Sequence, residues 1–232
     1  MRDFSRYDTR HYPTLPVAEG YAAWAERYEA TVLDLMDLRL LERLRSVRWS
    51  EAAEALDLAC GTGRVGAWLR AKGVAVVDGV DLTPAMLEKA AARGVYRRLQ
   101  TGDVTAPDAS GARFDLITQS LADEHMADLR PLYARAAQAA RPGAVFVLAG
   151  YHPWFLMAGI PTHFDLQPGR PVAIESYVHL ISDHVSAGLD AGWTLQEMVE
   201  GLVDEAWVAA KPKWAVHRDR PVSFALAWRR DG

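Results

Sequence analysis

The stretch Leu56-Asp57-Leu58-Ala59-Cys60-Gly61-Thr62-Gly63-Arg64-Val65-Gly66 decides the fold of this 232-residue chain. An apolar run that can form a strand meets two close glycines, and a helical pattern follows from Val65 to Leu69. Glycines at such a turn let the backbone approach a ligand closely and adopt positive φ at no steric cost. The stretch therefore predicts a ligand site at the carboxyl end of a strand in an open α/β sheet.

Two acids accompany this turn, and they leave two ligands open. The spacing Gly61-x-Gly63-x-x-Gly66 matches the dinucleotide pattern, and Asp81 lies at about the distance expected for a ribose-binding acid. This spacing makes a nicotinamide-dependent oxidoreductase one hypothesis. Asp57 opposes that hypothesis, because it stands inside the first strand, which in dinucleotide-binding proteins is usually wholly apolar.

The same stretch resembles motif I of the class I S-adenosylmethionine-dependent methyltransferases, which has an acid in the strand followed by two close glycines. Later segments resemble further elements of that family in the family's order; they are residues 79–87, 102–103, 114–117, 141–144 and 191–193. The resemblance covers roughly residues 50 to 230. It implies S-adenosyl-L-methionine as the cofactor.

The hydrophobic pattern and the resemblance predict one domain over residues 1–232. Strands are expected near 54–59, 74–81, 95–100, 114–119, 143–150, 194–200 and 221–229. Helical segments between the first five predict parallel strands with right-handed crossovers. The resemblance implies a Rossmann-like α/β fold: a seven-stranded, mostly parallel sheet with helices on both faces and an antiparallel last strand. Thr83-Pro84 is expected to start a helix.

Two segments are expected to surround the site. Residues 1–50 form an N-terminal helical cap, with an amphipathic pattern over 17–47 that predicts one or two helices. Residues 151–184 form a substrate lid, whose proline and glycine content argues against a regular element. Trp68 is expected in the core.

Composition excludes several classes of function. The chain has a net charge of −4 and no block of Lys or Arg, so we expect no nucleic-acid partner. No apolar stretch approaches the ~20 residues of a membrane span, and the N-terminus lacks a signal-peptide core. A single cysteine is typical of a reducing cytoplasm. We therefore predict a cytoplasmic protein with a small-molecule substrate; the oligomeric state is not predicted.

The resemblance implies roles for the residues around the turn. Asp81 would accept both ribose hydroxyls, and Asp103 would accept from the adenine amino group. Asp57 would orient the cofactor ammonium group. The remaining candidates for cofactor binding are Gly61, Thr62 and Gly63 at the methionine end, Leu82 and Val104 beside the acids, and Gln119 and Ser120 beside the sulfonium.

The cap is expected to close the site with aromatic side chains. Tyr21 and Trp24 are candidates because aromatic faces suit a sulfonium cation, although packing in the core is an equal alternative for Trp24. Arg10 would pair with the cofactor carboxylate.

Histidines are the candidates for catalysis, because a base near neutral pH suits a weakly acidic nucleophile. The lid holds four of the seven histidines, and His152 and His163 flank its apolar run. His125 follows the strand at 114–119. It also ends the run Asp123-Glu124-His125, but adjacent residues rarely converge on one ion, so we assign no metal.

The sequence thus predicts methyl transfer from S-adenosylmethionine to the oxygen, nitrogen or carbon of a small apolar or aromatic molecule. Residues 119–123 lack the Asp/Asn-Pro-Pro-aromatic tetrapeptide of many DNA and protein amine methylases, which disfavours an amide nitrogen as acceptor. The alternatives are a cofactor-binding protein without methyl transfer, such as a cyclase or a sensor, and the less favoured nicotinamide-dependent oxidoreductase.

Overall fold

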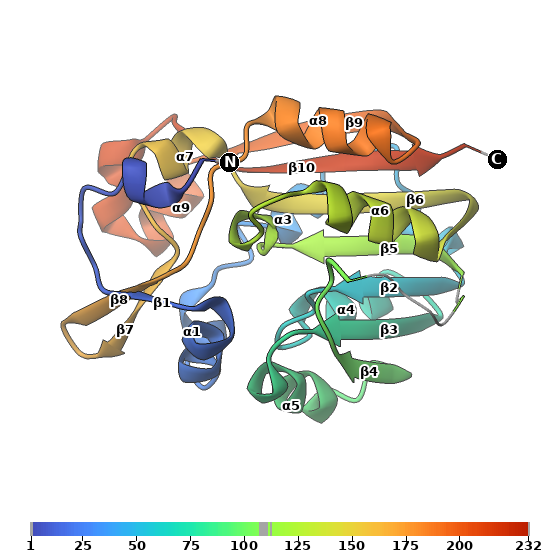
Figure 1. Ribbon diagram of the computed structural model, residues 1–232, viewed down its shortest axis with the longest axis horizontal. Coiled ribbons are helices and arrows are strands. Elements are labelled where there is room, and N and C mark those ends of the chain that lie inside the picture. Colours follow the sequence, from blue (N-terminus) through green and yellow to red (C-terminus); the bar gives the residue numbers. More distant parts are fainter. Residues whose placement is uncertain (1, 107–110, 112, 232) are drawn as a thin grey trace.

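The computed structural model describes residues 2–106, 111 and 113–231. Its main sheet has seven strands within the described residues, and the sheet runs across the molecule in Figure 1. In spatial order they are β4 (Arg98–Thr101), β3 (Val76–Asp81), β2 (Glu54–Leu58), β5 (Phe114–Ser120), β6 (Ala140–Tyr151), β10 (Pro221–Arg230) and β9 (Trp193–Leu202).

The sheet has the predicted topology. Strands β4, β3, β2, β5 and β6 are parallel, and β10 is antiparallel to both of its neighbours. The last strand therefore enters between β6 and β9 through a hairpin with β9. The Rossmann-like fold class is confirmed.

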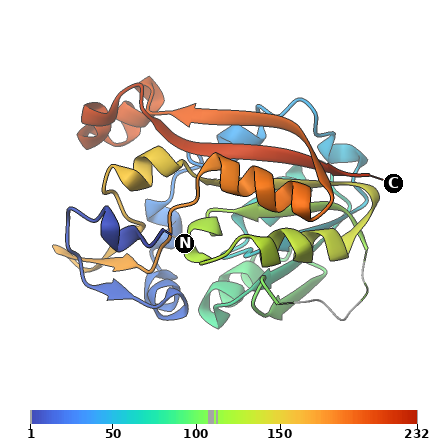
Figure 2. The ribbon, with the colours of Figure 1, turned by 45° about the horizontal axis from the view of Figure 1, so that its top comes forward.

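Helices cover both faces of this sheet. On one face, α6 (Arg130–Ala139) and α8 (Ile181–Asp190) bury Tyr133, Phe146 and Trp228. On the other, α3 (Leu38–Leu41) and α4 (Arg64–Ala71) bury Leu40 and Leu69. Figure 2 shows α6 and α8 lying over the strands. Each large apolar side chain removed from water stabilises the fold by about 1.5–3 kcal/mol, so both helix layers are anchored to the sheet.

The helix after β3 begins where the sequence predicts. Pro84 is the first residue of α5 (Pro84–Ala92), and Thr83 occupies the cap position. The Thr83 side chain makes no capping hydrogen bond there. Instead, the Thr83 backbone N–H donates to a carboxylate oxygen of Asp81 at 2.8 Å, so the acid at the end of β3 also orders the start of the helix.

A second layer of structure covers the carboxyl ends of the parallel strands, at the left of Figure 1. It contains a three-stranded sheet of β1 (Thr14–Leu15), β8 (Arg170–Ile174) and β7 (His163–Gln167). Around it lie η1 (Phe4–Arg6), α1 (Val17–Trp24), α2 (Tyr28–Thr31), α7 (Pro153–Met157), α9 (Glu205–Ala210) and η4 (Pro212–His217). We call this layer the cap.

The expectation of an irregular lid is wrong. Residues 151–184 contain α7, the β7–β8 hairpin and the start of α8. Gly169 takes φ 73° at the hairpin turn, a conformation that glycine adopts without strain. Phe164 and Ile174 then pack on Trp24 of the N-terminal segment. The proline and glycine content thus marks the ends of short elements that pack on a remote part of the chain.

The N-terminal segment also differs from its expected form. Residues 17–47 contain three short helices rather than one or two, because the backbone is extended at Val32 and a buried Asp37 precedes α3. Two further short turns are η2 (Trp49–Glu51) and η3 (Asp123–His125). Trp68 is half-buried at the surface, not in the core; its ring lies edge-on to Trp49. None of the described helices has the length and apolarity needed to cross a membrane.

Candidate functional site

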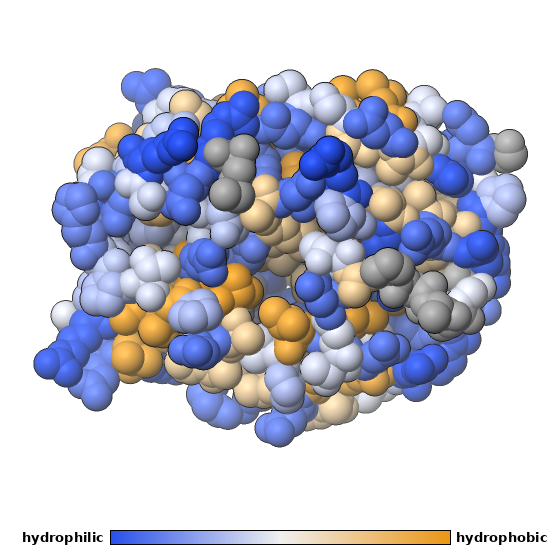
Figure 3. All heavy atoms as spheres, viewed as in Figure 1, coloured by the Kyte–Doolittle hydropathy of each residue, from blue (hydrophilic) through white to orange (hydrophobic). Residues whose placement is uncertain are grey.

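A cavity of about 380 Å³ opens where the carboxyl ends of β2, β3, β4 and β5 meet the cap. In Figure 3, hydrophobic side chains gather around a hollow between the cap and the sheet. We call this cavity the cofactor cavity. It is lined by Val17, Tyr21, Tyr28, Ala59, Gly61, Asp81, Leu82, Thr83, Met86, Gly102, Asp103, Val104, Thr105, Ser120, Leu121, Ala122, His125, Met126, Ala127, Asp128 and Pro131.

Two lining residues without a glycine's freedom take a left-handed backbone. Ala59 has φ 54° directly after β2, and Leu121 has φ 53° directly after β5. Such a conformation costs on the order of 1–3 kcal/mol and persists where the surrounding structure imposes it, as at binding sites. Each of the neighbouring strands β2 and β5 is thus followed by a strained left-handed residue at this cavity.

Asp81 holds the turn of motif I in place. Its two carboxylate oxygens accept from the backbone N–H of Gly61 at 2.7 Å and of Thr83 at 2.8 Å. Burial raises the pKa of Asp81, and these two donors oppose that effect. Each oxygen keeps a lone pair for a further donor. The carboxylate can therefore accept two hydroxyl groups from the cavity.

The glycines of the turn serve two different purposes. Gly61 takes φ 52° with open space beside it, whereas Gly63 takes φ 82° at the N-cap position of α4. A Cβ on Gly66 would overlap the Tyr96 hydroxyl. Gly66, the third glycine of the pattern, therefore leaves room for the Tyr96 ring and not for a pyrophosphate.

Asp57 lies beneath the turn, outside the cofactor cavity. It accepts hydrogen bonds from the Tyr96 hydroxyl and from Thr118 Oγ1, each at 2.8 Å. Burial raises the pKa of Asp57 to about 6. Together with Thr62 it lines a recess of about 30 Å³ next to the cavity. The Asp57 carboxylate is therefore held by two side chains of the protein, those of Tyr96 and Thr118.

Four further predicted residues line the cofactor cavity. Leu82, Val104 and Ser120 do so, as does Asp103, whose Oδ1 accepts from the backbone N–H and the hydroxyl of Thr105. Gln119 does not line it. With its amide turned to suit its neighbours, the Gln119 side-chain oxygen accepts from the backbone N–H of Ala122 at 2.8 Å.

An ion-pair network that the sequence did not reveal adjoins the turn. Arg64, the first residue of α4, donates to both carboxylate oxygens of Asp37 at 3.0 and 3.2 Å. The Ser120 hydroxyl donates to the same carboxylate at 2.8 Å. All three residues line the recess beside the cofactor cavity. Asp37 lies directly before α3 in the N-terminal segment, so only the folded chain brings this acid to motif I.

Tyr21 and His125 form a hydrogen-bonded pair in the cofactor cavity. The His125 Nδ1–H donates to the carbonyl oxygen of Glu175 at 2.6 Å, which leaves Nε2 as an acceptor. Burial raises the pKa of Tyr21 well above its usual range, so its hydroxyl keeps the proton and donates to Nε2 at 2.8 Å. The predicted aromatic closure and one predicted histidine thus meet here.

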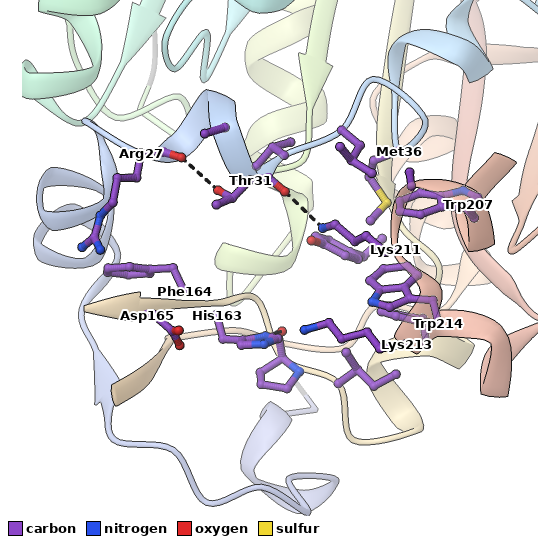
Figure 4. Close-up of a pocket in the computed structure, with 18 of the residues that line it drawn as sticks. Arg27, Thr31, Met36, His163, Phe164, Asp165, Trp207, Lys211, Lys213 and Trp214 are labelled. Atoms are coloured by element: carbon purple, nitrogen blue, oxygen red, sulfur yellow. Dashed lines mark hydrogen bonds between the residues drawn. The ribbon is translucent and has the colours of Figure 1, made fainter. Parts of the chain in front are cut away.

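A second cavity, of about 690 Å³, lies inside the cap and is drawn in Figure 4. Phe164 and Arg27 lie on one side of it, and Trp207, Trp214 and Lys211 lie on the opposite side. We call it the cap cavity. The structure places Trp24 and His163 in its wall and not at the cofactor cavity.

Arg10 and His152 also lie outside both cavities. Arg10 lines a smaller cavity of about 160 Å³, and its guanidinium lies over the Tyr12 ring, 5.9 Å from the centroid. His152 precedes α7: its Nδ1 accepts from the Trp154 backbone N–H at 3.1 Å, and its Nε2 lies 3.0 Å from Glu200. We therefore assign Arg10 no contact with the cofactor and His152 a role in helix capping.

Asp123 is a buried acid behind the cofactor cavity. Its Oδ2 lies 3.4 Å from Nε2 of His184, and its Oδ1 has no hydrogen-bond partner among the described residues. Burial raises the pKa of Asp123 to about 7 and lowers that of His184 to about 3, so both groups are held toward their neutral forms. Within the described residues, no group of three His, Cys, Asp or Glu side chains could hold a metal ion.

The shifted pKa of Asp123 predicts a pH-dependent stability. An unfolded Asp releases its proton near pH 3.8, and folded Asp123 releases it near 7, so this residue's contribution to stability is lost as the pH rises between these values. Asp123→Asn removes the titration. We expect this variant to gain on the order of 1–3 kcal/mol relative to the natural chain between pH 5 and 8.

Urea unfolding of both proteins at several pH values measures this effect. His184 acts in the opposite direction and is present in both chains, so the difference between them reports on Asp123 together with its interaction with His184. A difference that does not change with pH would contradict the assignment.

Comparisons with known proteins agree with this geometry. A family model described as a methyltransferase domain matches residues 55–143. Methyltransferase-like protein 27 of Homo sapiens is 40% identical over 115 residues, covering 44% of this chain and 46% of that protein. Malonyl-[acyl-carrier protein] O-methyltransferase of Serratia marcescens is 30% identical over 134 residues, covering 57% of this chain and 51% of that protein. The chain spans about half the length of these curated relatives.

A solved structure is similar over most of the fold. An S-adenosylmethionine-dependent methyltransferase from Mesorhizobium loti matches with a TM-score of 0.68 and 23% identity, covering 84% of this chain and 98% of that one. The matched domain spans motif I, Asp81, Asp103 and strand β5. Residues 55–143 of the chain thus match a methyltransferase domain, and the fold is similar to that of a solved S-adenosylmethionine-dependent methyltransferase.

Proposed function

We propose that this chain binds S-adenosylmethionine in the cofactor cavity and transfers its methyl group to a small apolar or aromatic molecule. The observation that carries the proposal is the convergence of Gly61, Asp81 and Asp103 on one cavity under an aromatic roof. When bound, the cofactor supplies an electrophilic methyl group on a sulfonium. Methyl transfer is an in-line displacement, so the protein contributes chiefly by positioning the two reactants.

Each part of the cofactor has a matching group in the cavity. The Asp81 carboxylate suits the ribose hydroxyls, because each oxygen can accept one charge-assisted hydrogen bond. Asp103 and Val104 suit the adenine, and the faces of Tyr21 and Tyr28 suit the sulfonium.

For the amino-acid end we propose Arg64 and Asp37 in place of Arg10. Their guanidinium and carboxylate lie at the recess beside motif I and match a carboxylate and an ammonium group. This arrangement would give the segment before α3 a direct role in holding the cofactor.

His163 is the histidine best placed to take a proton from an acceptor molecule in the cap cavity. Its Nδ1–H donates to the Pro161 carbonyl oxygen at 2.8 Å, so Nε2 carries the free lone pair. Burial lowers the pKa of His163, which keeps the ring neutral near pH 7. His125 already accepts from Tyr21 and is the second candidate.

Titration calorimetry tests the choice of cofactor. We expect S-adenosylmethionine and its demethylated product to bind with micromolar dissociation constants, and NAD to give no measurable heat. The carboxylates suit the hydroxyl and amino donors of the S-adenosyl compounds. The space beside Gly66, where a dinucleotide's pyrophosphate would need room, is filled by the Tyr96 ring. Binding of NAD without binding of either S-adenosyl compound would overturn the proposed function.

A further inference from the structure

The cap cavity is walled by flat aromatic pairs. Trp24 and Phe164 stack with ring centroids 5.1 Å apart and an interplanar angle of 8°. Trp207 and Trp214 stack at 4.6 Å and 4°. All four line the cavity, together with apolar side chains from α7 and the segment before α3. Such walls favour the apolar body of a small organic molecule.

Positive side chains enter the same cavity without acidic partners. Arg27, Lys211 and Lys213 line it, and Asp165 is the one acid among its lining residues in the described part of the chain. Lys211 Nζ donates to the Thr31 carbonyl oxygen at 3.1 Å, as drawn in Figure 4. Arg27 donates to the Leu166 carbonyl oxygen at 2.9 Å.

The two lysines lie close enough for their positive charges to interact. Burial and the nearby charge of Lys213 lower the pKa of Lys211, so two ammonium groups repel each other beside an apolar space. Lys213 forms no hydrogen bond or ion pair with any residue that the structure describes. By contrast, Lys72 and Lys89 on the sheet domain pair with Glu42 and Glu26. The Lys213 side chain is exposed, so its ammonium group is solvated and is available to an anion at the cavity.

The cap cavity also lies next to the cofactor cavity. The Trp24 ring stacks on Tyr21 at 5.9 Å and meets Tyr28 edge-on at 5.0 Å, and both tyrosines line the cofactor cavity. The Trp24 ring, on the side of the cap cavity, and the two tyrosine rings, on the side of the cofactor cavity, therefore lie between the two spaces along this wall. A molecule in the cap cavity would lie close to the proposed methyl donor.

We propose that the cap cavity binds the methyl acceptor and that this acceptor is an organic carboxylate with an apolar body, held by Lys211 and Lys213. An atom of the acceptor forms a bond to the methyl carbon as the sulfonium–methyl bond breaks, which requires the Trp24 and Tyr21 rings to move aside and leaves the cofactor as a thioether. The proposal rests on the proposed function, which supplies the methyl donor. The carboxylate meets the two ammonium groups, and the aromatic pairs cover the body. The neutral form of the same molecule would leave both lysines unpaired.

Matched probes test the recognition of charge. We would measure binding of 3-phenylpropanoate against 3-phenylpropanamide, and of octanoate against octanamide, by ligand-observed NMR on the full chain. We expect each carboxylate to bind at least about tenfold more tightly than its amide, because hydrogen bonds to charged groups are the stronger kind. The better of the two carboxylates distinguishes an aromatic body from an acyl chain.

Variants connect this preference to the lysines. In Lys213→Gln, and more strongly in the Lys211→Gln/Lys213→Gln double variant, we expect the carboxylate to lose its advantage while the amide binds unchanged. Lys72→Gln is the matched control, because this lysine pairs with Glu42 far from the cavity, and it should retain the full preference.

The outcomes separate the two proposals. Equal binding of acid and amide in the natural chain, or a preference that survives in the double variant, would overturn the carboxylate site. Calorimetry with demethylated cofactor on the same samples reports on the cofactor cavity alone. Loss of cofactor binding with an intact carboxylate preference would overturn the proposed function and leave the anion site standing as a separate one.

Discussion

Replacing Asp81 by alanine is expected to weaken binding of the demethylated cofactor at least about tenfold while the chain stays folded. Two charge-assisted hydrogen bonds to the ribose would be lost, and each contributes about 1.5–3 kcal/mol. The backbone N–H groups of Gly61 and Thr83 would also lose their acceptor, so the turn itself would be less ordered. Titration calorimetry measures the affinity, and circular dichroism checks the fold.

Asp78→Ala is a matched control for this experiment. Asp78 lies on the same strand β3 but pairs with Arg97 at the surface, so its removal should leave the affinity within error of the natural chain. Unchanged affinity in a folded Asp81→Ala variant would show that the ribose binds elsewhere. An equal loss in both variants would indicate a general disturbance of β3.

Gly66→Ala is expected to destabilise the chain by on the order of 1–3 kcal/mol, the usual cost of overpacking. The added methyl group would overlap the hydroxyl and ring of Tyr96, which is held by its hydrogen bond to Asp57. In a Tyr96→Ala background the same substitution should instead stabilise α4 by about 0.5–1 kcal/mol, since alanine favours a helix over glycine.

Urea unfolding of the four chains of this double-mutant cycle measures the reversal. The reversal distinguishes a glycine kept for Tyr96 from one kept for a bound pyrophosphate. If Gly66→Ala destabilised both backgrounds equally, the account of the third glycine would be wrong. A loss of cofactor affinity without any loss of stability would be equally contrary to it.

The sheet could be predicted from the sequence because its signals are local. Strands β2, β5 and β6 contain apolar runs next to turn residues, and the helix starting at Pro84 carries its own signal. Gly61, Asp81 and Asp103 could be placed together because the carboxyl ends of parallel strands meet at one edge. These residues lie at that edge and line one cavity.

The cap could not be predicted, because its contacts join segments far apart in the chain. Phe164 and Trp24 stack across the interface of the β7–β8 hairpin and α1, and no local pattern announces that pairing. Asp37 looks like an ordinary acid in a helical segment, yet it is buried against Arg64. The charge of Arg10 suggests a contact with the cofactor carboxylate, but in the structure Arg10 lines a smaller cavity beside η4.

A crystal structure of the chain with demethylated cofactor tests the central claim most directly. The account predicts ribose hydroxyls on the Asp81 carboxylate, adenine beside Asp103 and Val104, and the sulfur facing the aromatic layer that adjoins the cap cavity. Cofactor bound outside the cavity at the ends of β2, β3, β4 and β5, or bound there with its sulfur turned away from Tyr21 and Tyr28, would contradict it.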